Sequence, residues 1–325
     1  MATRNYTDVK ILLWGGYNLV GAMSQISTLQ RSAVLEDVTC FGTAAQTFSD
    51  AGERMGKFSF SGYYDDATLG SNAALTGNVA SFLPLCVGVA GNAVGQPFTG
   101  TTGAEQTTNR TAAIGKMTHI SADMVYSGES DEGQIQFPLG AISGATTNSA
   151  SIDFGSTSSA NGLVAYLQVP ALTLGSATNL AVTMQDSADN SSWANITGGA
   201  FTVIASSITT TPVAQRLVIS GTIRRYTRAV LTFTTSSTGA SATVFVGIFR
   251  GTTASGPVSL IAPSGRARTA LDVAASVLGP DDDRLTSIGD AEAAPPSAAD
   301  DPPAVTPTPA RSSVAEDDAD TQKEN

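Results

Sequence analysis

The chain is poor in the residues that most active sites need. Its 325 residues include one histidine, His119, and two cysteines, Cys40 and Cys86. A hydrolytic triad needs a histidine beside a nucleophile, and no Gly-x-Ser-x-Gly turn supplies one. A metal site needs clustered ligands, whereas these three residues are scattered along the sequence. The sequence therefore predicts no catalytic residue, no metal and no cofactor, and we do not expect an enzyme.

Charge is also scarce, and most of it lies at one end. Charged residues make up 14% of the chain, well below the usual quarter. From Gly251 onward there are 13 acidic and 5 basic residues, a net of −8, which leaves −3 of the total −11 for the first 250. The body is thus nearly neutral and lacks the basic surface that grips nucleic acid.

Long apolar runs are missing as well. Ile11–Trp14 is too short for a signal-peptide core, and Ala80–Gly95 is broken by Pro84 and too short to span a bilayer. We expect a protein that is made in a cytoplasm and contacts no membrane. In that compartment Cys40 and Cys86 should be reduced, small buried residues.

Ser, Thr, Ala and Gly replace the missing charges, and this composition favours strands and turns. The clearest pattern is the alternation in Lys57–Gly62, where Phe58 and Phe60 share one face and the serines share the other. Residues 1–135 are predicted to form one β-barrel domain with a minor helix at Leu69–Val79, and Gly91–Thr111 to be a loop or an extended hairpin arm. The other strands predicted in this domain are Val9–Leu13, Gln25–Leu29, a strand from Leu35 to Gly42, Phe82–Ala90, and Ile114–Tyr126 with Ile114, Ile120, Met124 and Tyr126 facing inward.

A second antiparallel β-sandwich domain is predicted over residues 136–251, after a join between Ser127 and Gly162 that contains a charged turn at Glu129–Gly133. Its predicted strands are Leu163–Val169, Leu180–Gln185, Phe201–Ile204, Arg216–Ser220, Tyr226–Thr234 and Thr243–Phe249. The remainder, residues 252–325, is an acidic Pro/Ala-rich tail that holds nine of the fourteen prolines. We expect it to be disordered apart from a short helix at Ala270–Leu278.

The order of motifs in the first domain resembles the major tail tube proteins of long-tailed (siphovirus-type) bacteriophages. The matching residues are Gly16-Tyr17, Glu36–Thr39, Phe41-Gly42 and Ser59–Asp66. The resemblance covers residues 1–130 well and 131–250 loosely, and its motifs are structural. It implies a barrel with a helix packed against it, and copies that form rings, trimeric or hexameric, which stack into a tube in the virion tail. It also implies an electronegative bore through which DNA passes without specific binding, and contacts with other phage tail proteins.

Two sets of residues are candidates for assembly. Glu36, Asp37, Asp65 and Asp66 are predicted near the bore or a ring contact. Arg224, Arg225 and Arg228 could pair with carboxylates across a subunit contact, or form a solvated hairpin end.

The alternative function is a virion decoration protein or a glycan-binding β-sandwich. Trp193 beside Asp186, Asp189 and Asn190 suits a sugar, although a single Trp at a loop end is more often a packing anchor.

Overall fold

The computed structural model describes residues 9–37, 48–128, 130–155 and 158–251, which all belong to one compact unit, residues 1–262. The described part is mostly antiparallel β-strand, with one helix, α1 (Ser71–Gly77), so the predicted fold class is confirmed. No helix in the described ranges is long and apolar enough to cross a membrane. The predicted tail and its helix at 270–278 lie outside these ranges.

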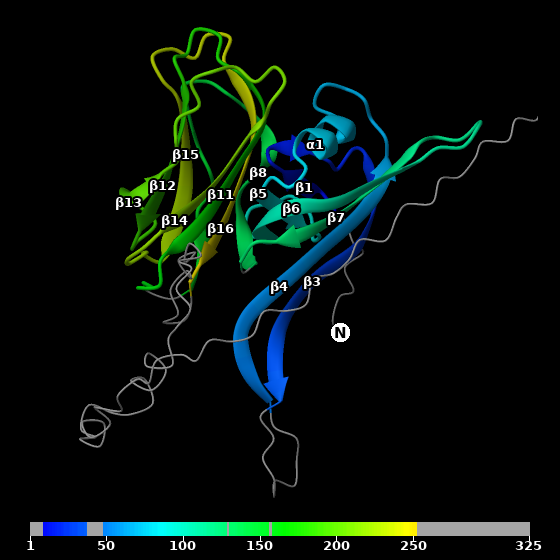
Figure 1. Ribbon diagram of the computed structural model, residues 1–325. Coiled ribbons are helices and arrows are strands. Elements are labelled where there is room, and N and C mark those ends of the chain that lie inside the picture. The colour runs from blue at the N-terminus through cyan, green and yellow to red at the C-terminus, as the bar shows by residue number, and fades with distance from the viewer. Residues whose placement is uncertain (1–8, 38–47, 129, 156–157, 252–325) are drawn as a thin grey trace, which may run out of the picture. The chain divides into compact units, whose positions relative to one another are not determined.

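Sixteen strands form two sheets in the described residues. The larger sheet runs in the order β14-β11-β16-β8-β6-β5-β1-β2, with β7 beside β6, β4 beside β7 and β3 beside β4. The smaller sheet runs β10-β15-β12-β13, with β9 beside β15 (Figure 1). The strands are β1 (Ile11–Trp14), β2 (Tyr17–Asn18), β3 (Met23–Asp37), β4 (Phe48–Tyr63), β5 (Leu83–Gly88), β6 (Pro97–Thr111), β7 (His119–Tyr126), β8 (Asp131–Ser143), β9 (Thr146–Asn148), β10 (Ile152–Asp153), β11 (Leu163–Thr173), β12 (Leu180–Ser187), β13 (Ala194–Ala200), β14 (Val213–Ile219), β15 (Tyr226–Phe233) and β16 (Ser241–Arg250).

The N-terminal half, residues 9–128 without the gap at 38–47, is named the barrel half, and it packs around an aromatic and aliphatic core. β1 and β2 meet through Gly15-Gly16, which both have positive φ, as the tight two-residue hairpin turn requires. Trp14 at the end of β1 is fully buried, and its indole N–H donates to the Gly103 carbonyl oxygen at 3.1 Å. The rest of this core comes mainly from alternate residues of β4, β5 and β7 and from α1: Phe58, Phe60, Ala74, Leu75, Leu85, Val87, Ile120, Ala122 and Met124.

The C-terminal half is a sandwich. Alternate residues of β12 and β15 face alternate residues of β11 and β16, and together they bury a second core. Its members include Leu167, Val182, Met184, Leu231, Val244 and Val246.

A third cluster connects the two halves. The Phe98 ring packs edge-on against Tyr166 at 5.9 Å and Phe245 at 5.7 Å between ring centroids. The Phe98 ring fits here because residue 247 is glycine: a Cβ at this position would lie 2.3 Å from the Phe98 Cζ atom. The predicted boundary at residues 135 and 136 falls inside β8, which pairs with β6 on one side and β16 on the other. The division into two domains stays a prediction.

Several element boundaries predicted from sequence are corrected. Strands expected at Gln25–Leu29 and from Leu35 are one strand, β3, because the chain continues through the polar residues between them. Phe201–Ile204 is not a strand, since β13 ends at Ala200 and only Ile204 makes a bridge. Ile114 does not face inward: it lies in the β6–β7 turn and is fully exposed, whereas Ile120 and Met124 are buried as predicted.

Candidate assembly surface

Four neighbouring strands, in the order β3-β4-β7-β6, form a sheet with one apolar and one polar face. Phe58 and Phe60 of β4 and Ile120, Ala122 and Met124 of β7 point into the core. Since side chains alternate along a strand, the residues between them occupy the opposite face. The strand register aligns that face into three complete cross-strand rows, Gln25–Ser61–Ser121–Asn109, Thr28–Ser59–Asp123–Thr107 and Gln30–Lys57–Val125–Ala104.

The polar face carries almost no net charge in these rows. The Asp123 carboxylate accepts a hydrogen bond from the Ser59 hydroxyl at 2.5 Å, and its Oδ1 lies 3.7 Å from Lys57 Nζ. At the end of the sheet nearest the β6–β7 turn, the His119 ring rests against Tyr63 with centroids 5.0 Å apart. His119 is therefore an exposed strand residue on a polar face, with Thr111 opposite it on β6.

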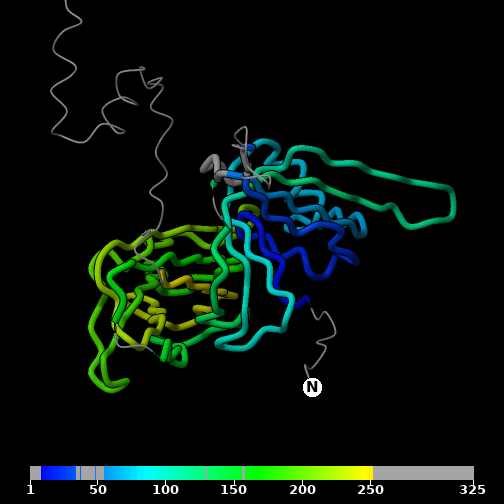
Figure 2. Tube along the Cα trace, turned by 90° about the horizontal axis from the view of Figure 1, so that it is seen from below, coloured from blue at the N-terminus to red at the C-terminus, as the bar shows by residue number. Residues whose placement is uncertain are grey.

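Two hairpins extend this sheet beyond the barrel. β4 pairs with β7 only from Lys57 to Tyr63, so the earlier part of β4 and the end of β3 continue as a two-stranded arm. β6 and β7 continue past the core in the other direction, as Figures 1 and 2 show. Within the described residues β3 pairs with β4 alone, which leaves the outer edge of a fifteen-residue strand without a neighbour. Such an edge can add a strand from another chain.

The predicted acidic residues lie at opposite ends of β4. Glu36 and Asp37 are paired with Ser49 and Phe48 in the arm, while Asp65 and Asp66 follow Tyr63.

Asp65 organises the turn into α1. Its carboxylate accepts the Ala67 amide at 3.0 Å, its carbonyl accepts the Asn72 amide at 3.0 Å, and the Ser71 hydroxyl joins its amide to the Tyr63 carbonyl. The structure therefore does not bring the four acidic residues together.

The three arginines predicted at a subunit contact, Arg224, Arg225 and Arg228, all have partners within the chain. Arg225 makes a bidentate ion pair with Asp153, with both contacts at 2.7 Å, and this hydrogen bonding lowers the pKa of Asp153 to about 2. The Arg224 amide donates to the Asp186 carboxylate at 2.9 Å.

Arg228 donates to the Gln185 side-chain oxygen at 2.8 Å and stacks on the half-buried Trp193 ring at 4.3 Å. Arg228 therefore covers part of the Trp193 ring. Whether any of the three arginines also contacts a second subunit stays a prediction.

One buried polar cluster was not predicted. The Tyr166 hydroxyl donates to Asp131 Oδ2, and Arg216 donates to both the Tyr166 oxygen at 3.0 Å and Asp131 Oδ2 at 3.2 Å. Burial raises the pKa of the Tyr166 phenol, so it stays protonated. Asp131 was expected in an exposed charged turn, but it begins β8 and is buried, 85 residues from Arg216 in sequence.

Two buried ionisable groups stand apart from this cluster. Burial raises the pKa of the Cys86 thiol to about 12, and Cys86 is a free, fully buried cysteine, as expected; Cys40 lies outside the described residues. Glu105 on β6 is 3% exposed, neither carboxylate oxygen has a hydrogen-bond partner, and burial raises its pKa to about 7. Within the described ranges no three His, Cys, Asp or Glu side chains gather as a metal site.

No protein-family model and no curated protein matches the sequence. Three solved chains show a slight structural likeness. A chain from the tail of an empty gene transfer agent particle of C6 symmetry is 13% identical and has a TM-score of 0.28; the match covers 34% of this chain and 81% of that one. A chain from the virion of a native gene transfer agent particle is 12% identical with a TM-score of 0.31, covering 39% and 98%.

The third is the Dit protein of SPP1, described as a hub adsorption apparatus of phages that infect Gram-positive bacteria. It is 10% identical with a TM-score of 0.28, and the match covers 74% of this chain and 98% of that one. Two of these chains thus come from gene transfer agent particles and one from a phage, and likenesses of this strength assign no function to the present chain.

Proposed function

We propose that this protein is a structural subunit of a phage tail tube, whose copies close into rings and stack around a bore that DNA crosses. The single observation that carries this proposal is the polar face of β3-β4-β7-β6. A sheet with one face on a core and the other made mainly of Ser, Thr, Asn and Gln suits the wall of a water-filled channel.

The chemistry of that face favours sliding over binding. Proteins hold DNA mainly by neutralising its phosphates with Lys and Arg. Two of the three rows contain neither, and the one cation of the third row, Lys57, lies beside the Asp123 carboxylate. Phosphates passing such a wall would find hydroxyls and amides but no uncompensated positive charge.

The edges of the same sheet supply a means of closing a ring. The outer edge of β3 offers unpaired backbone groups over a long, exposed strand, and a neighbouring copy that pairs with it would continue the sheet around the bore. If the β3 edge of one copy pairs with a different edge of the next, the contact is heterologous, and the ring closes at a fixed number of copies, three or six in the resembling family.

Electron microscopy of purified protein at high concentration tests the assembly. Rings or stacked tubes are expected, and persistent monomers would contradict the proposal. The same images of protein lacking residues 252–325 determine whether the acidic tail takes part in assembly. Protein that forms no rings but binds capsids or a glycan array would favour the decoration or glycan-binding alternative.

A charge-addition variant tests which face lines the bore. Thr28→Lys with Ser121→Lys adds two cations to the polar rows, and Thr183→Lys with Thr232→Lys adds two to the outer face of the small sheet as the matched control. Tubes of the first variant should retain DNA in a filter-binding assay, with affinity falling steeply as salt rises. Equal retention by both variants would argue against a bore at this face.

A further inference from the structure

The turn of the β6–β7 hairpin presents apolar side chains to water. Ile114 is fully exposed and Met117 is 65% exposed, at the end of a two-stranded extension that leaves the barrel core behind (Figure 2). Lys116 lies between them in sequence and is also exposed. Covering apolar groups at the tip of a projecting hairpin with another surface lowers the free energy, because it removes them from water.

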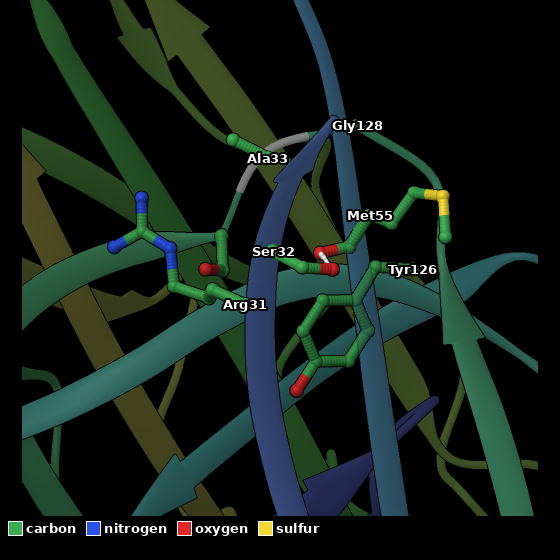
Figure 3. Close-up of a pocket in the computed structure, with 7 residues that line it drawn as sticks. Arg31, Ser32, Ala33, Met55, Tyr126 and Gly128 are labelled. Carbon is green, nitrogen blue, oxygen red and sulfur yellow. Dashed lines mark hydrogen bonds between the residues drawn. The ribbon is translucent and has the colours of Figure 1, made fainter. Parts of the chain in front are cut away.

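A small pocket lies where β7 ends and the β3–β4 arm begins. It has a volume of about 220 Å³ and is lined by Arg31, Ser32, Ala33, Met55, Tyr126, Gly128 and Ser130. Figure 3 shows the Arg31, Met55 and Tyr126 side chains among the residues that line it. Met55 is one of the lining residues, and it is 58% exposed, so the described chain leaves much of this apolar residue uncovered. This volume accepts an aliphatic side chain such as that of Ile114.

The tip and the pocket stand at opposite ends of the same strand. Tyr63 pairs with His119 at the end of β7 that carries the tip, and Lys57 pairs with Val125 at the end that carries the pocket. One copy therefore cannot fill its own pocket with its own tip. A second copy placed end to end along the strand direction can, and the contact repeats indefinitely because it never closes on itself.

We propose that the Ile114–Met117 tip of one copy docks into the pocket beside Met55 and Tyr126 of the next copy, and that this contact stacks successive rings. The inference rests on the proposed tube function and identifies a residue-level contact for it. Charge supports the pairing, because the 53% exposed Glu132 carboxylate lies 3.8 Å from Arg31, a residue of the pocket, and offers a partner to an incoming Lys116. The Arg31–Glu132 pair is long and exposed, so a new cation can share the carboxylate at little cost.

Cross-linking between two singly substituted proteins tests the contact. Ile114→Cys and Met55→Cys are prepared separately in a Cys40→Ser background, mixed, assembled and treated with a short bis-maleimide. Cross-linked dimers should exceed those of either protein alone by about tenfold or more, since thiols held at a docked contact have a high effective concentration. The matched control replaces Met55→Cys with Val203→Cys, which is similarly exposed but lies in the sandwich half.

Ile114→Asp provides a second readout that does not depend on cross-linking geometry. The side chain is free of the core, so circular dichroism and the melting temperature should match those of the original protein. Single rings should persist while tubes disappear from micrographs.

The outcomes separate this inference from the proposed function. Tubes of normal length from Ile114→Asp, with no selective cross-link, would overturn the tip-and-pocket contact and leave the tube function standing. Cross-links already present in isolated rings would overturn its assignment to stacking. Failure of the original protein to form rings would overturn both.

Discussion

The two halves of the molecule differ in how completely they cover their own apolar surface. Of the eleven large hydrophobic side chains that are exposed in the described residues, nine lie before Gly128 and two, Val203 and Val218, lie after it. The sandwich half buries its two sheets against each other, whereas the barrel half sends two hairpins beyond its core. The barrel half therefore has the surface that a partner would complete, and the sandwich half is close to self-sufficient.

The strongest test of this comparison is whether the halves unfold together. Phe60→Ala in the barrel core should lower the free energy of unfolding by about 3–5 kcal/mol, and Leu231→Ala in the sandwich by about 2–5 kcal/mol. Because the Phe98–Tyr166–Phe245 cluster joins the halves, each substitution should move one shared transition.

The two tryptophans provide the measurement, since Trp14 lies in the barrel core and Trp193 in the sandwich half. Urea unfolding is followed in Trp193→Phe and Trp14→Phe proteins, each of which retains one reporter. Separate midpoints for the two reporters would show that the halves are independent.

A smaller effect is expected at the polar cluster between the halves. Arg216→Met leaves the Asp131 carboxylate buried without its cation, which should cost about 3 kcal/mol. Arg225→Met breaks a shorter but exposed ion pair, and its denaturation midpoint should stay close to that of the original protein. Equal losses from the two substitutions would mean that the cluster does not stabilise the junction.

Glu105 should make the barrel half less stable as the pH rises. Its folded pKa of about 7 is above the unfolded value of 4.5, so the folded state holds a proton that the unfolded state has lost between these values. Stability falls with rising pH across that window and then levels off. Glu105→Gln should raise the melting temperature at pH 8 by about 2–4 °C, the shift that ~1 kcal/mol produces in a domain of this size, and have little effect at pH 4. A gain that does not depend on pH would rule out the carboxylate charge as its cause.

The smallest effect concerns Trp193. Trp193→Ala removes a stack with the Arg228 guanidinium and should cost about 0.5–1 kcal/mol in thermal unfolding. Arg228→Lys keeps the charge but loses the planar stack, and most of this loss should remain. If Trp193→Ala leaves stability unchanged yet abolishes retention on a glycan array, Trp193 is a binding residue and not a packing anchor.

Much of the barrel half could be predicted from local pattern alone. The alternation around Phe58 and Phe60 correctly identified the inward face. The strand at Ile114 was extended too far because an apolar side chain in a turn resembles the next inward residue of a strand. β8 was missed because its buried polar residues, among them Asp131 and Gln136, give no apolar alternation.

The sequence by itself determined the mainly antiparallel β class, the scarcity of catalytic residue types and the acidic character of the C-terminal end. These follow from composition and from periodicities of a few residues. Only the tertiary structure decided which serines, threonines and amides share one face, because bulges at Glu105 and along β3 shift the register between strands. It also decided that Asp131 meets Arg216 and that the exposed tip and the pocket lie at opposite ends of one strand, since strand pairing and side-chain packing bring together residues that are distant in sequence.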